Sequence, residues 1–239
     1  MIDIIRAEFQ KSKRTSINKF IVISPLLAIF ISFLWGGGQN GAYNWWYTMF
    51  LPGILTIISS QVISIEKNLL YKGILLYPRD KGAIWLGKII YISILLILTS
   101  LIFMAGIIGL GLISESSISL KANIYATIIL IITSLFITPV SMFLTVKFNM
   151  FISIIFNMLM IAIGVVFYDT NSIIKFLPYR IWSTLMIPIL GILPNGLPAP
   201  ENDSFLDGSM IMKETITCFM IFIILALITA LWFRKEGEA

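Results

Sequence analysis

Residues 89–113 read IIYISILLILTSLIFMAGIIGLGLI, and no charged side chain occurs in this stretch. An α-helix rises about 1.5 Å per residue, so the stretch is long enough to cross a hydrocarbon core of about 30 Å. Lipid offers no hydrogen-bond partners to the backbone, and a segment of this kind must therefore satisfy its own backbone groups as a helix. The stretch predicts a membrane-spanning helix.

The rest of the chain repeats this pattern. Of its 239 residues, 58% are hydrophobic and 12% are charged, whereas soluble domains are about 25% charged. The hydrophobic residues gather in charge-free runs. We therefore predict an all-α membrane protein with six transmembrane helices, at Phe20–Trp35, Tyr47–Ile65, Ile89–Ile113, Ile124–Val146, Met150–Tyr168 and Thr215–Phe233.

The segment before the first span is polar and basic. Ile2, Ile5 and Phe9 recur in it at helical spacing, which is typical of an amphipathic helix lying along a membrane surface. We expect residues 1–19 to form this cytoplasmic helix and residues 20–239 to form a single transmembrane domain.

The distribution of Lys and Arg predicts the orientation. With the N-terminus in the cytoplasm, 13 basic residues flank the spans on the inside and four lie outside. Cytoplasmic segments of membrane proteins carry an excess of Lys and Arg. Both termini are therefore expected inside.

A further apolar stretch, Ile181–Pro198, is interrupted by Pro188, Gly191, Pro194, Gly196 and Pro198. A straight helix loses a backbone hydrogen bond at each interior proline. We therefore expect a re-entrant or interfacial hairpin on the outer side, within the segment 169–212 that precedes the last span.

The longest cytoplasmic connection between spans covers residues 66–88. Leu70, Ile74 and Tyr77 share one helical face, Pro78 ends that helix, and Asp80 is placed to cap the next one. The pattern fits a solvated positive-inside loop and equally an amphipathic helix that docks on a cytoplasmic partner.

Two features are expected on the outer side. Aromatic residues gather at the start of the second span, at Tyr43, Trp45, Trp46 and Tyr47, and such a cluster is typical of an interfacial aromatic belt. The alternative is a surface that contacts an amphipathic or peptide ligand. The acidic residues Glu201, Asp203 and Asp207 similarly fit a solvated loop or weak attraction of a cationic peptide.

Several classes of protein are excluded or disfavoured. The chain has no His and one Cys, which argues against a Ser–His hydrolase, a metal centre and a disulfide framework. It has no P-loop motif, and no charged residue lies within an expected span, which disfavours an ion-driven transporter. The basic residues flank apolar runs instead of forming a stripe, so nucleic-acid binding is not expected. We predict no catalytic residue, metal or cofactor in this chain.

The order of these features resembles the permease subunits of type-2 ABC exporters. Three stretches narrow the resemblance to the E-type permeases of lantibiotic-immunity transporters: Asn44-Trp45-Trp46-Tyr47 with Leu51-Pro52-Gly53, then Glu66-Lys67 with Tyr71-Lys72, and Ile189-Leu190-Gly191-Ile192-Leu193-Pro194-Asn195-Gly196-Leu197-Pro198. The last stretch is the most specific, and the resemblance extends over essentially the whole chain.

The resemblance implies a multi-pass protein of the bacterial cytoplasmic membrane that works with a cytoplasmic ATPase dimer and often a second, homologous permease. Such a complex expels a lantibiotic or other cationic antimicrobial peptide and gives immunity. The implied ATPase-coupling residues are Glu66, Lys67, Leu70, Ile74 and Tyr77, and the implied substrate-facing residues are Trp45, Trp46, Tyr47, Pro194 and Asn195.

Three alternatives remain at this point. One is a membrane immunity or sensor protein that binds the peptide without transport, and another is a type-2 permease for a different amphipathic substrate. The third is an intramembrane enzyme, which the missing His and the missing intramembrane carboxylates disfavour.

Overall fold

The regular structure of the chain is helical throughout the residues that the computed structural model describes, namely 1–13, 15–68, 80–113, 117–169 and 177–236. Within these ranges no strand forms, and one isolated bridge pairs Ile192 with Pro198. The helices are α1 (Ile2–Ser12), α2 (Ile17–Leu34), α3 (Gly38–Trp45), α4 (Leu51–Asn68), α6 (Lys81–Ile113), α7 (Leu120–Ser134), α8 (Ile137–Lys147), α9 (Met150–Val166), α10 (Pro178–Leu190) and α11 (Ile211–Glu236).

Within the described ranges, five continuous helical segments are long and apolar enough to cross a membrane. They are Ile17–Leu34, Gly38–Asn68, Lys81–Ile113, Leu120–Lys147 and Gly208–Lys235. The expected fifth span corresponds to α9, an apolar helix of 17 residues, at the short end of the range that crosses a bilayer. The chain is thus a multi-pass helical membrane protein, and its sixth span stays a prediction.

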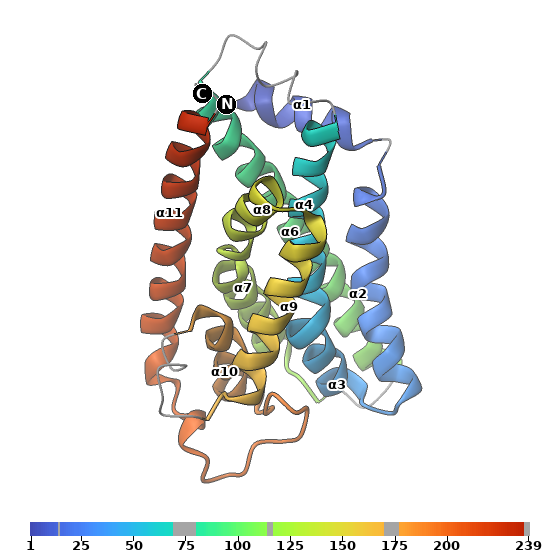
Figure 1. Cartoon of the computed structure of the whole chain (residues 1–239). Helices are drawn as coiled ribbons and strands as arrows, with labels where there is room; N and C mark the ends of the chain where they lie inside the picture. The colour runs from blue at the N-terminus through green and yellow to red at the C-terminus, as the bar shows by residue number, and fades with distance from the viewer. Residues whose placement is uncertain (14, 69–79, 114–116, 170–176, 237–239) are drawn as a thin grey trace.

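The long helices run side by side, and both termini lie at the same end of the bundle (Figure 1). Helix α1 lies across that end and contacts α6. The connection after α10 and the two short 3-10 turns before α11 lie at the opposite end. If the basic residues orient the chain as predicted, α1 marks the cytoplasmic end and the α10–α11 connection the outer end.

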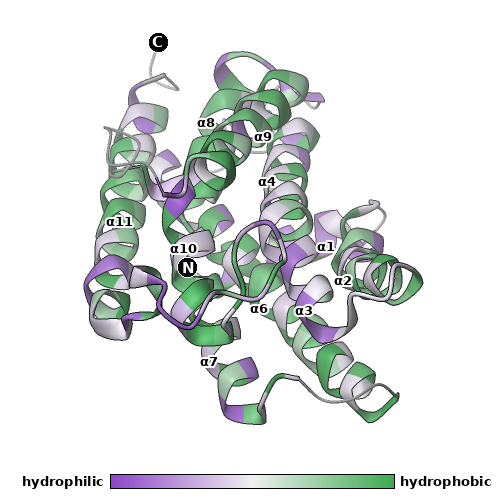
Figure 2. Ribbon diagram, turned by 90° about the horizontal axis from the view of Figure 1, so that it is seen from below, coloured by the Kyte–Doolittle hydropathy of each residue, from purple (hydrophilic) through white to green (hydrophobic). Residues whose placement is uncertain are grey.

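Apolar side chains cover the outside of the bundle as well as its core. Figure 2 shows hydrophobic residues along all the long helices. Phe30 of α2, Leu159 of α9 and Leu227 of α11 are each more than half exposed. An apolar surface of this extent is unfavourable in water and suits contact with lipid.

Two prolines explain irregularities in the bundle. Pro139 has no N–H and its ring crowds the carbonyl of Leu135, and the chain turns between α7 and α8 at Leu135 and Phe136. Pro52 likewise cannot bond to the carbonyl of Thr48. The turn before it, Trp46–Phe50, is a wider π-helical turn that joins α3 to α4.

Helix α10 is the apolar stretch in which a broken hairpin was expected. It has 13 residues and is therefore about 20 Å long, which is shorter than a hydrocarbon core. Its chain reverses at Gly191, whose φ of 70° lies in the left-handed region that glycine tolerates. Its depth in the membrane stays a prediction.

The orientation can be tested by labelling cysteines from outside the cell. In a Cys218→Ala background, we expect a membrane-impermeant maleimide to label Glu201→Cys and to leave Lys13→Cys unlabelled until the membrane is permeabilised. Both positions are exposed, so accessibility within the fold does not limit the reaction. The reverse pattern would invert the predicted topology.

Candidate functional site

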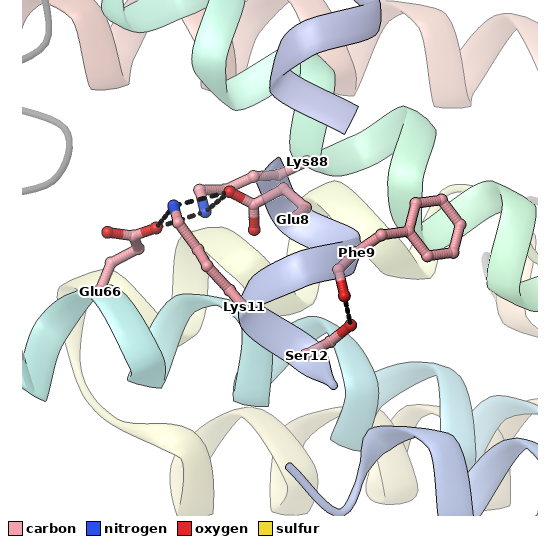
Figure 3. Close-up of polar contacts among 6 residues, drawn as sticks. All are labelled: Glu8, Phe9, Lys11, Ser12, Glu66 and Lys88. Atoms are coloured by element: carbon pink, nitrogen blue, oxygen red, sulfur yellow. Dashed lines mark hydrogen bonds and ion pairs between the residues drawn. The ribbon is translucent and has the colours of Figure 1, made fainter. Parts of the chain in front are cut away.

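Four charged side chains from three helices meet at the end of the bundle where both termini lie (Figure 3). Lys88 Nζ of α6 lies 2.8 Å from Glu8 Oε1 of α1 and 2.9 Å from Glu66 Oε1 of α4. Lys11 Nζ of α1 bonds to Glu8 Oε1 at 2.9 Å and also to Glu66 Oε1. We call Glu8, Lys11, Glu66 and Lys88 the charge cluster. It joins the surface helix α1 to two long helices of the bundle.

Three of the four residues in the cluster are buried and Lys11 is partly exposed, and the two carboxylates are balanced by two ammonium groups. Glu66 and Lys88 are 0% and 1% exposed, and a buried charge is tolerated only when it is paired. Burial alone lowers the pKa of Lys11, but its hydrogen bonds to Glu66 and Glu8, together with their charges, outweigh this and raise the pKa. Lys11 therefore stays protonated at physiological pH.

Packing around the cluster fixes α1 in place. Phe9 stacks edge-on against Tyr91 of α6, with ring centroids 4.8 Å apart. Ile4 lies so close to α6 that a Cβ at Gly87 would come within 2.5 Å of its side chain. Movement of α1 must consequently move α6 or break these contacts.

At the opposite end, which the predicted orientation places outside, a second contact joins α3 and its π-helical turn to the loop after α10. Asn44 Nδ2 donates to the Pro194 carbonyl at 2.8 Å, and the Tyr47 hydroxyl donates to the Leu193 carbonyl at 3.1 Å. Gly196, at a φ of 86°, lies against the Asn44 side chain. We call Asn44, Tyr47, Leu193, Pro194 and Gly196 the outer contact.

A row of hydrogen-bonded polar side chains lies between the two ends. Thr145 bonds to Ser60 at 2.8 Å, Ser60 to Ser153 at 3.2 Å, and Tyr179 to Asn157 Oδ1 at 2.7 Å. Asn157 Nδ2 donates to the hydroxyl of Ser141 at 3.2 Å. These residues form a polar seam that connects α4, α8, α9 and α10; its members are Ser60, Ser141, Thr145, Ser153, Asn157 and Tyr179.

The seam gives a prediction for Asn157, which is 0% exposed. Replacing Asn157 with Leu leaves the Tyr179 hydroxyl without its acceptor, and an unsatisfied buried polar group costs about 1–3 kcal/mol. We expect a lower thermal midpoint in detergent. The Asn157→Leu/Tyr179→Phe double variant removes both partners and should recover part of the loss. Equal melting of the single variant and the wild type would contradict a stabilising role for the seam.

The residues predicted to couple the chain to the ATPase differ in burial and position. Glu66 lies inside the bundle as part of the charge cluster and not on the cytoplasmic surface. Lys67 is exposed, and its Nζ donates to the Phe148 carbonyl at 3.0 Å. Leu70, Ile74 and Tyr77 lie outside the described residues. A direct contact of Glu66 with another protein is therefore not available in this conformation.

The predicted substrate-facing residues are mostly buried. Trp46 stacks on Phe103, with ring centroids 4.5 Å apart, and Tyr47 is 0% exposed. Trp45 is partly buried and contacts the exposed Trp35. Pro194 is buried and Asn195 is exposed. The aromatic residues thus pack inside the outer end, and Trp35, Trp45 and Asn195 remain accessible there.

Sequence reasoning missed Lys88, Glu8 and Lys11 as a group, because it interpreted them as residues flanking the membrane. The available signal was that two lysines and two glutamates, which can pair with one another, are predicted at the same end of the bundle. Among the described residues, no group of three or more His, Cys, Asp or Glu is placed to hold a metal ion.

The described helices form a multi-pass membrane protein whose surface helix α1 is tied to the bundle by buried ion pairs. The family described as ABC-2 family transporter protein matches residues 4–167, more than half of the chain. The chain belongs to this family and is a membrane permease component of an ABC transporter, a class that works with an ATP-binding subunit. No curated protein and no solved structure matches it. The match covers α1 to α9, so α10, the outer loop and α11 lie beyond it.

Proposed function

We propose that this chain is the permease subunit of an ABC exporter that expels a lantibiotic or similar cationic antimicrobial peptide from the bacterial cytoplasmic membrane. The complex would contain an ATPase dimer and a second, homologous permease. The chain itself would hydrolyse no ATP, because its sequence has no P-loop. Its role would be to form the membrane path and to protect the cell that carries it.

The outer contact is the observation that carries this proposal. The two outer stretches on which the resemblance to lantibiotic-immunity permeases rests lie 150 residues apart, at Asn44 and Pro194, and are hydrogen-bonded to one another. An exporter that takes a peptide from the outer leaflet needs a defined structure at this end. The exposed aromatic rings beside the contact suit an amphipathic peptide.

The charge cluster supports a route for coupling to the ATPase. We propose that the ATPase acts on the cytoplasmic segment 66–88 and on α1, and that the cluster transmits this motion to α4 and α6. Glu66 and Lys88 stand at the two ends of that segment, on adjacent helices, and Glu8 and Lys11 fasten α1 to both. Lys67 would face the ATPase directly, together with Leu70, Ile74 and Tyr77.

Resistance assays with a variant of the outer contact test the function. A sensitive bacterium that expresses this chain with its partner permease and ATPase should tolerate more lantibiotic than the empty strain. Gly196→Val should abolish most of this protection, because a branched side chain is strained at positive φ and would press on Asn44, whose Cγ lies 3.3 Å from the position of a Cβ. Gly208→Ala is the control: its φ is not in the left-handed region and a Cβ meets only the flexible Ile211 side chain.

The outcomes distinguish the alternatives. Protection that requires an ATPase able to hydrolyse ATP supports export. Equal protection by this chain without any ATPase would favour a protein that binds the peptide without transport. If neither arrangement protects the cell, while the permease and ATPase copurify, the substrate is of another class.

A further inference from the structure

Helix α1 packs on the bundle with one face and carries a second, apolar stripe beside that face. The face that packs consists of Ile4, Glu8 and Ser12, all of which are buried. The apolar residues that recur in the sequence of this helix lie on another side, and they form the apolar stripe Ile2, Ile5 and Phe9. Figure 3 shows Phe9 pointing away from the charge cluster. Ile2 is 78% exposed and Phe9 is 37% exposed, so the described residues leave most of Ile2 and part of Phe9 uncovered.

The apolar stripe lies at the level where α6 begins to expose apolar side chains. The ring of Phe9 packs edge-on against Tyr91, with ring centroids 4.8 Å apart. Ile90, which precedes Tyr91, is 38% exposed and begins a row of exposed apolar residues on α6: Ile90, Ile97, Leu98, Leu101 and Ile108. Such a surface suits lipid acyl chains. The stripe therefore lies next to one end of the lipid-facing surface of α6.

Two basic side chains follow the apolar stripe around α1. Successive residues of an α-helix are about 100° apart around its axis. Arg6 and Lys13 therefore lie next to the stripe and nearly opposite the face that packs on the bundle. Both side chains are exposed, and among the described residues neither forms an ion pair, in contrast to Lys11. Asp3 is the exposed acidic residue of this helix, so its exposed side keeps a net positive charge.

This combination is typical of a helix that lies in the interface of an anionic membrane. The apolar side chains enter the boundary of the acyl chains, and the long basic side chains reach the phosphates at headgroup level. A soluble protein would approach the polar side of α1 from the end of the bundle (Figure 1). The apolar stripe instead lies beside lipid-facing Ile90, which favours a lipid as the partner of the stripe and of the cations next to it.

We propose that the apolar stripe, Arg6 and Lys13 form a docking surface for anionic phospholipids. Ile2 and Phe9 lie among the acyl chains, and the two cations bind the phosphate groups. The charge cluster ties α1 to α4 and α6, so the bound lipid holds the same end of three helices. This binding belongs to the chain alone, and it depends neither on the proposed peptide substrate nor on the ATPase.

The accessibility of spin labels tests whether the apolar stripe enters the bilayer. The full-length chain, in a Cys218→Ala background and in nanodiscs of phosphatidylglycerol and phosphatidylcholine, carries a nitroxide at Ile2→Cys or, as the matched control, at Gln10→Cys. Both positions are exposed, but Gln10 lies on the polar side of α1. We expect the label at Ile2 to be accessible to oxygen and shielded from a water-soluble nickel chelate, and the label at Gln10 to show the reverse. Equal access of the nickel chelate to both labels would overturn the proposal.

Lipid retention tests the role of the two cations. The full-length chain is released from nanodiscs of equal phosphatidylglycerol, phosphatidylethanolamine and phosphatidylcholine content and examined by native mass spectrometry. Each Lys or Arg near the surface strengthens the attraction to anionic lipid by about fivefold, and Asp3 offsets part of this, so we expect phosphatidylglycerol to be retained about tenfold over phosphatidylcholine. Arg6→Gln/Lys13→Gln should remove most of this preference, and the charge-preserving Arg6→Lys/Lys13→Arg should keep it. Lys121→Gln/Lys213→Gln is the control, because it removes the same charge from exposed positions at the opposite end.

Three results would contradict the assignment to an anionic lipid at α1. Equal retention of the three lipids, or an equal loss of preference in Lys121→Gln/Lys213→Gln, would show that these two cations do not select the lipid. Soluble glycerophosphoglycerol should compete weakly because it lacks acyl chains, and full competition at equal concentration would assign the surface to a free phosphate compound. If Arg6→Gln/Lys13→Gln releases the ATPase and leaves the lipid preference unchanged, the cations belong to a protein interface and the proposal is wrong.

Discussion

Replacing Lys88 with Met is expected to destabilise the protein by about 3–5 kcal/mol, the usual cost of removing one partner of a buried ion pair. Lys88 is 1% exposed and lies between Glu8 and Glu66, both of which are almost fully buried. Without it, two carboxylates share the single ammonium group of Lys11. The measurement is thermal unfolding in detergent, followed by circular dichroism, with the amount of protein in the membrane as a second readout.

Two further variants make this prediction specific. In Glu66→Gln/Lys88→Met the Glu8–Lys11 pair remains, so most of the lost stability should return. If the cluster transmits ATPase motion, the double variant should still fail to protect cells from the peptide, because α1 is no longer tied to α4 and α6 by charge. Lys67→Met removes an exposed charge and should change stability by less than about 0.5 kcal/mol. A Lys88→Met protein that unfolds like the wild type would show that the cluster contributes little.

The charge cluster lies where two helices continue beyond the expected spans. The sequence interpretation ended the second span at Ile65 and began the third at Ile89, since charged residues follow and precede them. In the structure α4 continues to Asn68 and α6 begins at Lys81. Pairing between Glu66 and Lys88 removes the cost of placing each inside the bundle, and hydropathy along one sequence contains no information about such pairing.

Local signals, by contrast, predicted helix ends correctly. Asp80 was expected to cap the helix that carries Ile84 and Trp85, and its Oδ1 accepts from the Ala83 N–H at 2.8 Å. A helix cap is formed by residues that are neighbours in the chain, so it can be predicted from a single sequence. The continuous span expected from Ile124 to Val146 corresponds to the helical segment Leu120–Lys147, in which the chain turns at Leu135 and Phe136, just before Pro139.

Long-range contacts account for what the sequence did not predict at the candidate site. Both halves of the outer contact were identified as motifs, but nothing in one sequence pairs Asn44 with Pro194. The same holds for Asn157 and Tyr179, which are hydrogen-bonded in the structure. Aromatic residues beside a span were expected to lie at the interface or on a surface that contacts a ligand. Trp46 is instead buried against Phe103, whereas Trp45 is only partly buried.

Replacing Gly164 with Ala should force α9 and α10 apart. A Cβ at Gly164 would lie 2.5 Å from the carbonyl oxygen of Tyr179 and 2.9 Å from the backbone nitrogen of Arg180. Both atoms belong to the helix backbone, so a rotamer change cannot relieve the overlap. Inserting a methyl group into such a contact costs about 1–3 kcal/mol. We expect lower thermal stability. Because α10 leads into the outer contact, we also expect the variant to lose most of its protection against the peptide even at temperatures where it remains folded.

Gly109→Ala is the matched control for this substitution. Gly109 also lies within a long apolar helix, α6, but a Cβ there meets no atom within 4 Å. Alanine is favoured over glycine in a helix by about 1 kcal/mol, so this variant should be as stable as the wild type or slightly more stable. Crosslinking between cysteines placed on α9 and α10 would report the separation directly. Unchanged crosslinking and unchanged protection in Gly164→Ala would mean that the close approach of these two helices is not needed for function.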